Sequence, residues 1–505
     1  MTGKIIISAL TAVLASFTAA GQDSLLVRLY DKAQPIKAEA FTPALTDVSM
    51  LFVPWMAGTT TEALYNFSRQ GKAVFTQNGK GLDMGEFKAS SLKFLRKDRA
   101  VKGSVSYQRG VKKDVCWNTS SDYELLYPYV MADTVGGKLQ MEQYAFAGAY
   151  AGSIGEWKYG IGGSYRALHE YRQTDPRPRN ITSDLSLRLS AGRVFGHYIL
   201  SASASYRRYH QLQSVTFLSP KGANTAEFHL TGLGTHYARL AGTGTLTNLR
   251  FRGNGFSTAI QLQKDTAEGL SASAEYSQFQ SVRHLPNQNE VPYSKLLTQN
   301  VNAFAAYRGR IGGKLLYGLR LNLGYELRQG DEAIIPNTIA SGAEGLKYLT
   351  LYRNRMPSAE LTGLVQTQAA GGTLSFEAGT GYNASDAVRK GADNRMKIQS
   401  VRGFGALGLA FTKGRIMTDV KLALGMTAHP GCSIFLPLRT ERFLEKHYIA
   451  MYDRLKETSF DFRLTGKLAC SLGKIALTIK PDATVIRWNS GAYALTGSIG
   501  AGIEF

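Results

Sequence analysis

Aromatic and acidic residues are concentrated in residues 114–137, DVCWNTSSDYELLYPYVMADTVGG. Aromatic rings offer broad apolar surfaces, and tyrosine and tryptophan add a polar tip, so such residues serve well as stacking platforms. The segment therefore suggests a recognition surface with aromatic platforms and acidic contacts. The alternative is an ordered loop that folds over the mouth of a larger structure and packs its tyrosines on itself. The candidate recognition residues are Trp117, Asp122, Tyr123, Glu124, Tyr127 and Tyr129.

A second unusual stretch, SYRALHEYRQTDPRPRNI, occupies residues 164–181. Its charged residues alternate with Tyr165, His169 and Tyr171, so an extended chain would place the charges on one face. Paired arginine and glutamate inside a closed sheet most often form a structural network, and a basic track for an anionic solute is the alternative. The candidate residues for such an interior are Arg166, Glu170, Arg172, Arg177, Arg179, Arg320, Glu326 and Arg328.

The clearest positioning element is residues 314–328, KLLYGLRLNLGYELR. Leucine and tyrosine occupy every odd position from 315 to 327, and the even positions are mostly charged, polar or glycine. Only a β-strand places alternate residues on opposite faces. A soluble strand usually has about five or six residues, whereas a tilted strand that crosses a bilayer needs about 9–11. This stretch therefore predicts a membrane-spanning strand.

Similar alternation recurs from residue 66 to the end of the chain, and the connections between the segments differ in length. Short connections include residues 153–156, 193–196 and 471–474, and long ones include 211–254 and 428–456. Short periplasmic turns that alternate with long extracellular loops are typical of outer-membrane barrels. The sequence thus predicts an all-β fold: a transmembrane antiparallel outer-membrane β-barrel of about 18 strands, with 16 as the alternative.

The two ends of the chain support export. Residues 1–21 have a lysine, an apolar run too short to cross a bilayer and a small-residue cleavage site, which predicts a Sec signal peptide. Residues 22–65 lack clean alternation and predict a periplasmic tail or a plug segment, with a disordered linker as the alternative. The barrel is expected over 66–505. The last strand ends at Phe505, which resembles the signal read by the barrel-assembly machinery of Gram-negative bacteria.

Composition narrows the possible functions. The three cysteines have no metal-ligand spacing, so neither a disulfide scaffold, a zinc site nor any other metal or cofactor is expected. The net charge of +21 is interleaved with apolar residues along strands, which favours a basic lumen or contact with lipopolysaccharide over nucleic-acid binding. The sequence has no G-x-S-x-G, H-E-x-x-H or Walker A motif, so we expect no enzyme.

Several segments resemble an uncharacterised family of large outer-membrane β-barrel proteins of Bacteroidota-type bacteria. The resemblance rests on NFSRQG at 66–71, on GKGLDMGEFKASS at 79–91, and on the two stretches described above. It covers nearly the whole mature chain. The family has no assigned activity, so no functional residue is carried over. Such proteins are often encoded near TonB-dependent receptors, which implies uptake as a theme without giving a mechanism.

These observations predict an outer-membrane barrel for the passage or capture of a solute, as an accessory to a nutrient-uptake system. A barrel hydrolase and a structural or assembly-linked barrel are the alternatives. The expected partners are the outer membrane with its lipopolysaccharide, the barrel-assembly machinery, and a TonB-dependent receptor or surface lipoprotein. If the lumen is continuous, its basic residues are expected to favour anions.

Overall fold

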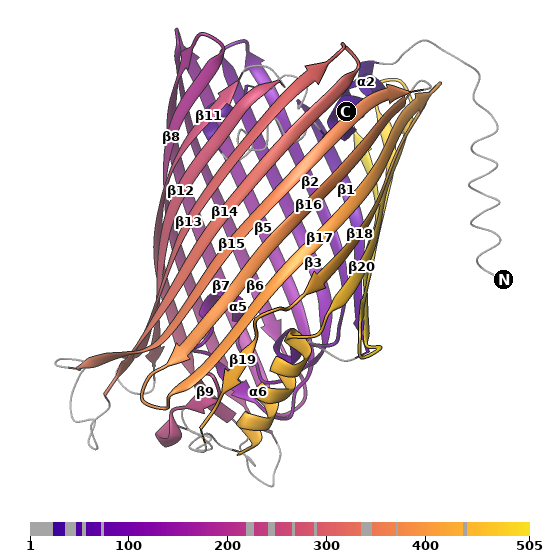
Figure 1. The fold of residues 1–505 in the computed structure, drawn as a ribbon. Coiled ribbons are helices and arrows are strands. Elements are labelled where there is room, and N and C mark those ends of the chain that lie inside the picture. The colour runs from indigo at the N-terminus through magenta and orange to yellow at the C-terminus, as the bar shows by residue number, and fades with distance from the viewer. Residues whose placement is uncertain are drawn as a thin grey trace.

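The computed structural model describes residues 24–35, 47–52, 57–71, 75–218, 227–240, 248–264, 268–286, 290–334, 346–369, 372–437 and 442–505. The predicted signal peptide lies outside these residues. Within them, one sheet of 19 antiparallel strands closes on itself, because the first strand pairs with the last. One member, β19 (Ser433–Phe435), is short and continues the pairing of β18 along β17. The wall therefore has 18 long strands (19 less β19), as the sequence predicts, and forms a tall barrel (Figure 1).

The wall strands are, in chain order, β1 (Gly58–Gln70), β2 (Gly81–Arg96), β3 (Arg99–Val115), β5 (Gly137–Ile154), β6 (Trp157–Tyr171), β7 (Arg177–Phe195), β8 (Tyr198–Thr216), β11 (Leu249–Lys264), β12 (Gly269–Leu285), β13 (Val291–Ile311), β14 (Leu315–Ala333), β15 (Tyr348–Ala369), β16 (Gly372–Arg389), β17 (Asn394–Lys413), β18 (Ile416–Ala428), β20 (Ser459–Ser471), β21 (Ala476–Trp488) and β22 (Tyr493–Glu504).

Alternation decides which side chains face outward. On β14, Leu319, Leu321 and Leu323 are exposed on the outer surface, while Arg320 and Asn322 face the lumen and bond Glu360. A wall with an apolar outside and a polar inside suits a sheet that has lipid on one side and water on the other. The fold is therefore an outer-membrane-type barrel, as predicted. No helix among the described residues is long and apolar enough to cross a membrane.

The connections separate by length between the two ends of the barrel. Turns such as those at Gly155 and Gly196, whose φ angles of 58° and 57° favour glycine, lie at the end that also holds the C-terminus. The long connections lie at the opposite end with α6 (Arg442–Leu455) and β9 (Glu227–Gly232) (Figure 1). The predicted segregation of short turns and long loops is thus present.

Two boundaries differ from the sequence-based expectation. The first wall strand begins at Gly58 instead of residue 66, because its opening residues, GTTTE, lack the apolar alternation that marks lipid contact. Several strands also run farther toward the long-loop end than predicted: β14 ends at Ala333 instead of residue 328. Alternation reports only the part of a strand that meets lipid, so polar extensions beyond the bilayer are missed.

The described N-terminal residues lie inside the barrel at the end that carries the short turns. The helix α2 (Ser24–Ala33) packs Leu25, Leu26 and Leu29 against inward-facing Met417, Ala469 and Ala476. The short helix η1 (Val48–Met50) contacts β5, β6 and β7, and Asp47 beside it accepts a hydrogen bond of 2.6 Å from Ser201. The segment for which a tail or a plug was predicted therefore narrows this mouth from within.

Two long connections, β3–β5 and β8–β11, build a small folded unit at the opposite end of the barrel. A three-stranded sheet joins β4 (Met131–Asp133), β9 and β10 (Thr235–His236), with α5 (Tyr123–Leu126) beside it in sequence. Buried apolar residues from these connections pack on inward-facing residues of β8, β11, β12 and β13, and so form a core inside the barrel. This core includes Leu126, Val130, Met131, Leu230, Tyr209, Phe251, Phe279 and Tyr293.

Candidate functional site

The connection between β3 and β5, residues 116–136, forms the centre of this unit and is called the cap below. Its first anchor is Asp122, whose two carboxylate oxygens accept hydrogen bonds of 3.0 and 2.6 Å from Arg166 on β6. Tyr209 on β8 also donates to Asp122 at 3.0 Å. A two-pronged arginine–carboxylate contact is among the stronger and more directional polar interactions. The cap is therefore fixed to the inner wall at β6 and β8.

The backbone of the cap is held by amides of the same part of the wall. Asn180 donates to the Thr119 carbonyl at 2.8 Å, and Gln213 donates to the Thr119 hydroxyl at 2.8 Å. Buried Glu170 accepts from Ser121 of the cap and, at 2.6 Å, from Lys112 of β3. Backbone groups in the interior need such partners, and these side chains supply them.

A second set of contacts fixes the far side of the cap. Tyr129 donates to Glu332 on β14 at 3.2 Å, and Glu332 is also ion-paired with Arg389 on β16. Arg328 donates to the Tyr127 carbonyl at 3.3 Å, and the Arg283 guanidinium lies 4.3 Å from the ring centre of Tyr293 in the core. The cap therefore bridges the lumen from β6 to β14, with polar contacts at both ends.

A fully buried ion pair holds the last turn of the cap. Arg172 donates to Asp133 at 2.7 Å, and neither side chain has any solvent exposure. The second Asp133 oxygen accepts the Gly136 backbone N–H at 2.6 Å, and the Arg172 Nε donates to the Pro176 carbonyl at 2.7 Å. Removal of one partner from such a pair leaves a buried charge without compensation.

The helix α6 covers the cap from a distant part of the chain. His447 stacks on Trp117 with ring centres 4.5 Å apart, and Phe443 lies on the same indole at 6.0 Å. Burial lowers the pKa of His447 to about 4, so this imidazole is neutral at pH 7. Its Nε2 lies 3.1 Å from the Gln77 amide nitrogen and can accept that N–H only in the neutral form.

Two cavities flank α5 at the level of the cap. One, of about 340 Å³, is lined by charged groups that include Lys112, Asp122, Arg166, Glu170 and Arg207. The other, of about 350 Å³, is lined by aromatic and thioether side chains that include Tyr123, Tyr127, Tyr352, Met356, Met396 and Met451. Ligand sites typically combine apolar walls with a few fixed polar groups. The two cavities together offer both kinds of contact on either side of α5.

The predicted recognition residues are brought together, but they mostly face inward. Tyr129 is buried, Tyr123 and Tyr127 are half-buried with ring centres 5.4 Å apart, and Trp117 is covered by α6. Asp122 binds Arg166, and Glu124 alone of the six is largely exposed. The geometry therefore matches the alternative of a loop folded over the mouth, and of its rings Tyr123 and Tyr127 line the cavities.

Most predicted lumen residues face the interior, and each has a close partner. Arg166 pairs with Asp122 and Asp184, Glu170 with Lys112, Arg172 with Asp133, Arg320 with Glu360 and Arg328 with Glu326.

Arg177 and Arg179 were wrongly placed in the lumen. Asn180 points inward to the cap, so strand alternation turns Arg177 and Arg179 to the outer face of β7. There Arg179 bonds outward-facing His169 at 3.3 Å and Arg177 bonds Asp175 at 2.7 Å. The sequence does not show at which residue β7 begins after the loop. A shift of one residue moves every side chain to the other face, so the facing of Arg177 and Arg179 could not be assigned.

Several anchoring residues were not singled out from the sequence. Lys112, Tyr209, Arg283, Glu332 and Arg389 all face the cap or its core. One weak pattern in the sequence could have found them. A charged residue near the long-loop end of a strand, at a position that alternation turns inward, does not contact lipid. Their partners are far away in sequence, however, as with the 203 residues between Tyr129 and Glu332.

The histidines with described partners do not form an evident catalytic group. His229 bonds Tyr293, His284 bonds the Glu290 carbonyl, His169 bonds Arg179 and His447 bonds Gln77. A hydrolase of the serine type would need a serine hydroxyl hydrogen-bonded to one of these rings, and none of these four partners is a serine. These contacts are structural and give the hydrolase alternative no support.

Comparison with known proteins identifies a family and finds outer-membrane proteins of limited structural similarity. The chain is similar to the outer-membrane transporter YddB from Escherichia coli (8% identity, 88% of this chain and 80% of that chain, TM-score 0.42). It is also similar to BauA, the ferric preacinetobactin receptor from Acinetobacter baumannii (7% identity, 89% and 80%, TM-score 0.44). It spans 60% of the length of CdiB from the same species (8% identity, 88% of this chain, TM-score 0.35).

These structural scores are low, so the strand pairing carries the fold assignment. No curated protein matches the chain. A sequence model of one family matches residues 53–505, which include the whole barrel. The chain therefore belongs to DUF6850, a family of unknown function.

Proposed function

We propose that this protein is an outer-membrane barrel for the passage or capture of a solute, and that the cap controls entry. The observation that carries the proposal is the chemistry of the cap's anchors. Asp122 with Arg166 borders the charged cavity, and Arg328 with the Tyr127 carbonyl borders the aromatic one, so both are polar contacts at a cavity wall. Water or a polar ligand can replace such contacts more readily than a purely apolar seal, because the separated groups remain solvated.

The lumen below the cap supports the same proposal. Its charged side chains, such as Lys88, Arg320 and Lys421, pair with Glu62, Glu360 and Glu377 along the wall. Such a lining favours water and polar solutes over apolar ones. At the other end, α2 narrows the mouth, so a second opening step is part of the proposal.

Permeation into liposomes tests the role of the cap. Asp122→Ala combined with Glu332→Ala removes one anchor on each side, and should increase the rate at which a neutral monosaccharide swells proteoliposomes. The matched control is Asp386→Ala, which removes a two-pronged pair with Arg395 on the outer face. Faster proteolysis of residues 116–136 in the double variant would verify that the cap has been released. Equal swelling of released and wild-type barrels would refute the proposed control of entry.

We also propose an outer-membrane location with the cap outward, and an accessory role beside a TonB-dependent receptor or surface lipoprotein. Cysteine labelling of whole cells tests the orientation, after Cys116, Cys432 and Cys470 are replaced by serine. Leu218→Cys in a long connection should react with an impermeant reagent, and Lys474→Cys in a short turn should not. The opposite result would invert the orientation. Co-purification from native membranes with a receptor or lipoprotein, but not with unrelated barrels, tests the partner.

A further inference from the structure

The outer surface of β7, β8, β11, β12 and β13 changes character abruptly along the strands. Toward the periplasmic end, outward positions are apolar, such as Leu200, Ala202, Ala204 and Tyr206 on β8 and Ile260 on β11. From Arg208 on β8 outward, the surface becomes cationic. Tyr198 to Arg208 is ten residues, close to the length that a tilted strand needs to cross the hydrocarbon. The change therefore falls where the outer leaflet has its headgroups.

The cationic patch consists of Arg208, His210, Arg250, Arg252 and His284. Strand register places them side by side, because His210 lies opposite Arg252, and Arg250 lies opposite both Leu212 and His284. Inward-facing Tyr209 and Phe251 are buried, which confirms that their neighbours in sequence point out of the barrel.

Among the described residues beside this patch on these strands, one is acidic. Glu290 pairs with Arg250 and, at 3.2 Å, with Arg252. Arg208 is exposed on a strand whose neighbours β7 and β11 present no acid on their outer faces. Three arginines thus share one carboxylate, and the patch keeps a positive charge at neutral pH.

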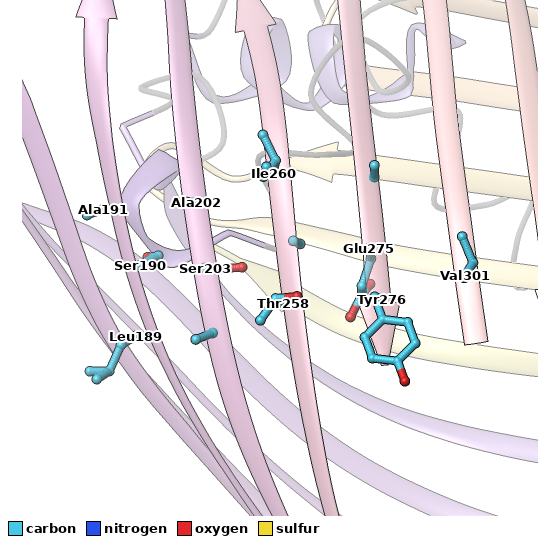
Figure 2. Close-up of a pocket in the computed structure, with 13 residues that line it drawn as sticks. Leu189, Ser190, Ala191, Ala202, Ser203, Thr258, Ile260, Glu275, Tyr276 and Val301 are labelled. Carbon is cyan, nitrogen blue, oxygen red and sulfur yellow. The ribbon is translucent and has the colours of Figure 1, made fainter. Parts of the chain in front are cut away.

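A shallow hollow of about 630 Å³ lies on the same strands, closer to the middle of the apolar band. Small residues make its floor: Ala191, Ala202, Ala204 and Ala274. Leu189, Ile260 and Tyr276 stand at its edges, as Figure 2 shows. Leu189 and Ile260 are each 60% exposed, so the hollow opens to the outside of the barrel.

The patch and the hollow are close enough to hold one amphipathic molecule. Ala204 and Arg208 are four residues apart on β8, which is about 13 Å along an extended strand. Tyr206 and Phe256, with ring centres 5.2 Å apart, lie between them at the interface, where Tyr206 donates to Asn254 at 2.8 Å. Aromatic rings with a polar tip are suited to that level of a membrane.

From this arrangement we infer a specific binding site for a phosphorylated glycolipid of the outer leaflet, of the lipid A type. Arg208, Arg252 and Arg250 bind its phosphate groups, and one acyl chain lies in the hollow over Ala204 and Ala274. Arginine suits the headgroup because its planar fork matches two phosphate oxygens. The site does not depend on the lumen or on transport, but it rests on the proposed orientation with the cap outward.

Lipid binding to the purified full-length protein tests this site. The probes are lipid A with two phosphates and the same lipid after both phosphates are removed, measured by native mass spectrometry from detergent. We expect one tightly retained lipid A per barrel. Arg208→Gln with Arg252→Gln should reduce its affinity at least about tenfold, equivalent to about 1.4 kcal/mol. The dephosphorylated lipid should bind the wild type and the double variant alike.

A matched control has the same loss of charge elsewhere. Arg353→Gln with Arg355→Gln removes two exposed arginines from the outer end of β15, on a different part of the circumference. This control should bind lipid A as the wild type does. Equal weakening in both double variants would mean a general attraction to a basic rim and would overturn the site.

The hollow is tested separately from the patch. Ala204→Leu with Ala274→Leu fills the floor with outward-facing apolar groups, which lipid tolerates. Binding of lipid A should weaken, while binding of a phosphorylated disaccharide without acyl chains should not. If both ligands bind this variant as they bind the wild type, the hollow holds no acyl chain and the site is refuted. A concentration-dependent dimer that the arginine changes dissociate would replace the lipid with a second copy of the chain.

Discussion

Two neighbouring residues of β14 lie on opposite faces of the wall, and their replacement should lower the free energy of unfolding by different amounts. Leu321 is exposed to the lipid side, whereas Arg320 donates to Glu360 and Thr362, both at 3.1 Å, in the lumen. Leu321→Arg should lower the free energy of unfolding by about 2–4 kcal/mol, because a cation would sit near the bilayer midplane.

Arg320→Leu should cost less than Leu321→Arg. Glu360 would keep the Asn322 amide as a donor at 3.4 Å, and water in the lumen can solvate it further. Urea unfolding from bilayers measures both free energies. Equal losses for the two variants would contradict the assignment of the two faces.

The Arg172–Asp133 pair gives a second prediction for single residues. Arg172→Met should destabilise the protein by about 3–5 kcal/mol, because Asp133 would become a buried charge without a counterion. Adding Asp133→Asn should recover much of this loss, since the amide oxygen can still accept the Gly136 N–H. The free energies of unfolding of the single and double variants form a thermodynamic cycle. Additive losses would show that the two side chains do not interact.

Among the elements, α6 is the one whose attachment should respond to pH. Burial holds the pKa of His447 at about 4, below its ordinary value of about 6.5. The neutral ring is therefore the form that the folded state prefers. Its contribution is fully present above about pH 6.5 and is lost as the pH falls toward about 4. Acidification should loosen α6 from Trp117.

Protease cleavage within residues 429–458 at pH 7 and pH 4.5 measures this loosening. His447→Phe keeps a ring on Trp117 but cannot be protonated, so cleavage in this variant should depend less on pH than in the wild type. The same increase in cleavage in both proteins would assign the pH dependence to other groups.

The wall could be predicted from the sequence, whereas the interior unit could not. The outward leucines of β14 can be recognised in the sequence, because lipid contact imposes a local alternation on each strand. The cap depends instead on contacts such as Asp122 with Arg166 and Tyr129 with Glu332, which join residues 44 and 203 positions apart. Composition indicated an unusual loop, but no local rule distinguishes a loop that points outward from one that folds into the lumen.

Glu142 shows how the phase of a strand limits such prediction. As an acid in a membrane-type strand it would be assigned to the lumen, but it accepts hydrogen bonds from Tyr107 and from Tyr144, which is exposed on the outer surface. Near the end of a strand, residues lie beyond the hydrophobic band. A polar side chain there can point either inward or outward, so its polarity does not show which. The pairing register resolves such positions, because Glu142 lies opposite Arg109 and His169.

At the scale of the whole molecule, the cap carries acids that pair with arginines of the lumen wall, so its proposed movement would change the charge of the lumen as well as its opening. Asp133 of the cap is the carboxylate beside Arg172, and Asp122 of the cap is one of two carboxylates beside Arg166. The other, Asp184 on β7, is shared with Arg207. Movement of the cap out of the lumen would leave Arg172 without its acid, and Arg166 and Arg207 with one acid between them. Pairs such as Lys421 with Glu377 and Arg402 with Asp461, which lie within the wall, would remain balanced.

The opened barrel should therefore prefer anions, and the closed barrel should pass little current. In a narrow conduit of low dielectric constant, uncompensated arginines raise the local concentration of anions. The preference should be stronger at low salt, because the Debye length is about 30 Å at 0.01 M and about 10 Å at 0.1 M. Planar-bilayer recordings under a salt gradient measure the reversal potential. The Asp122→Ala, Glu332→Ala variant should conduct with anion preference, and further replacement of Arg166 by Gln should reduce that preference. A cation-selective opened barrel would contradict this account, because it would mean that the acids along the wall, and not the arginines that the cap covers, set the field.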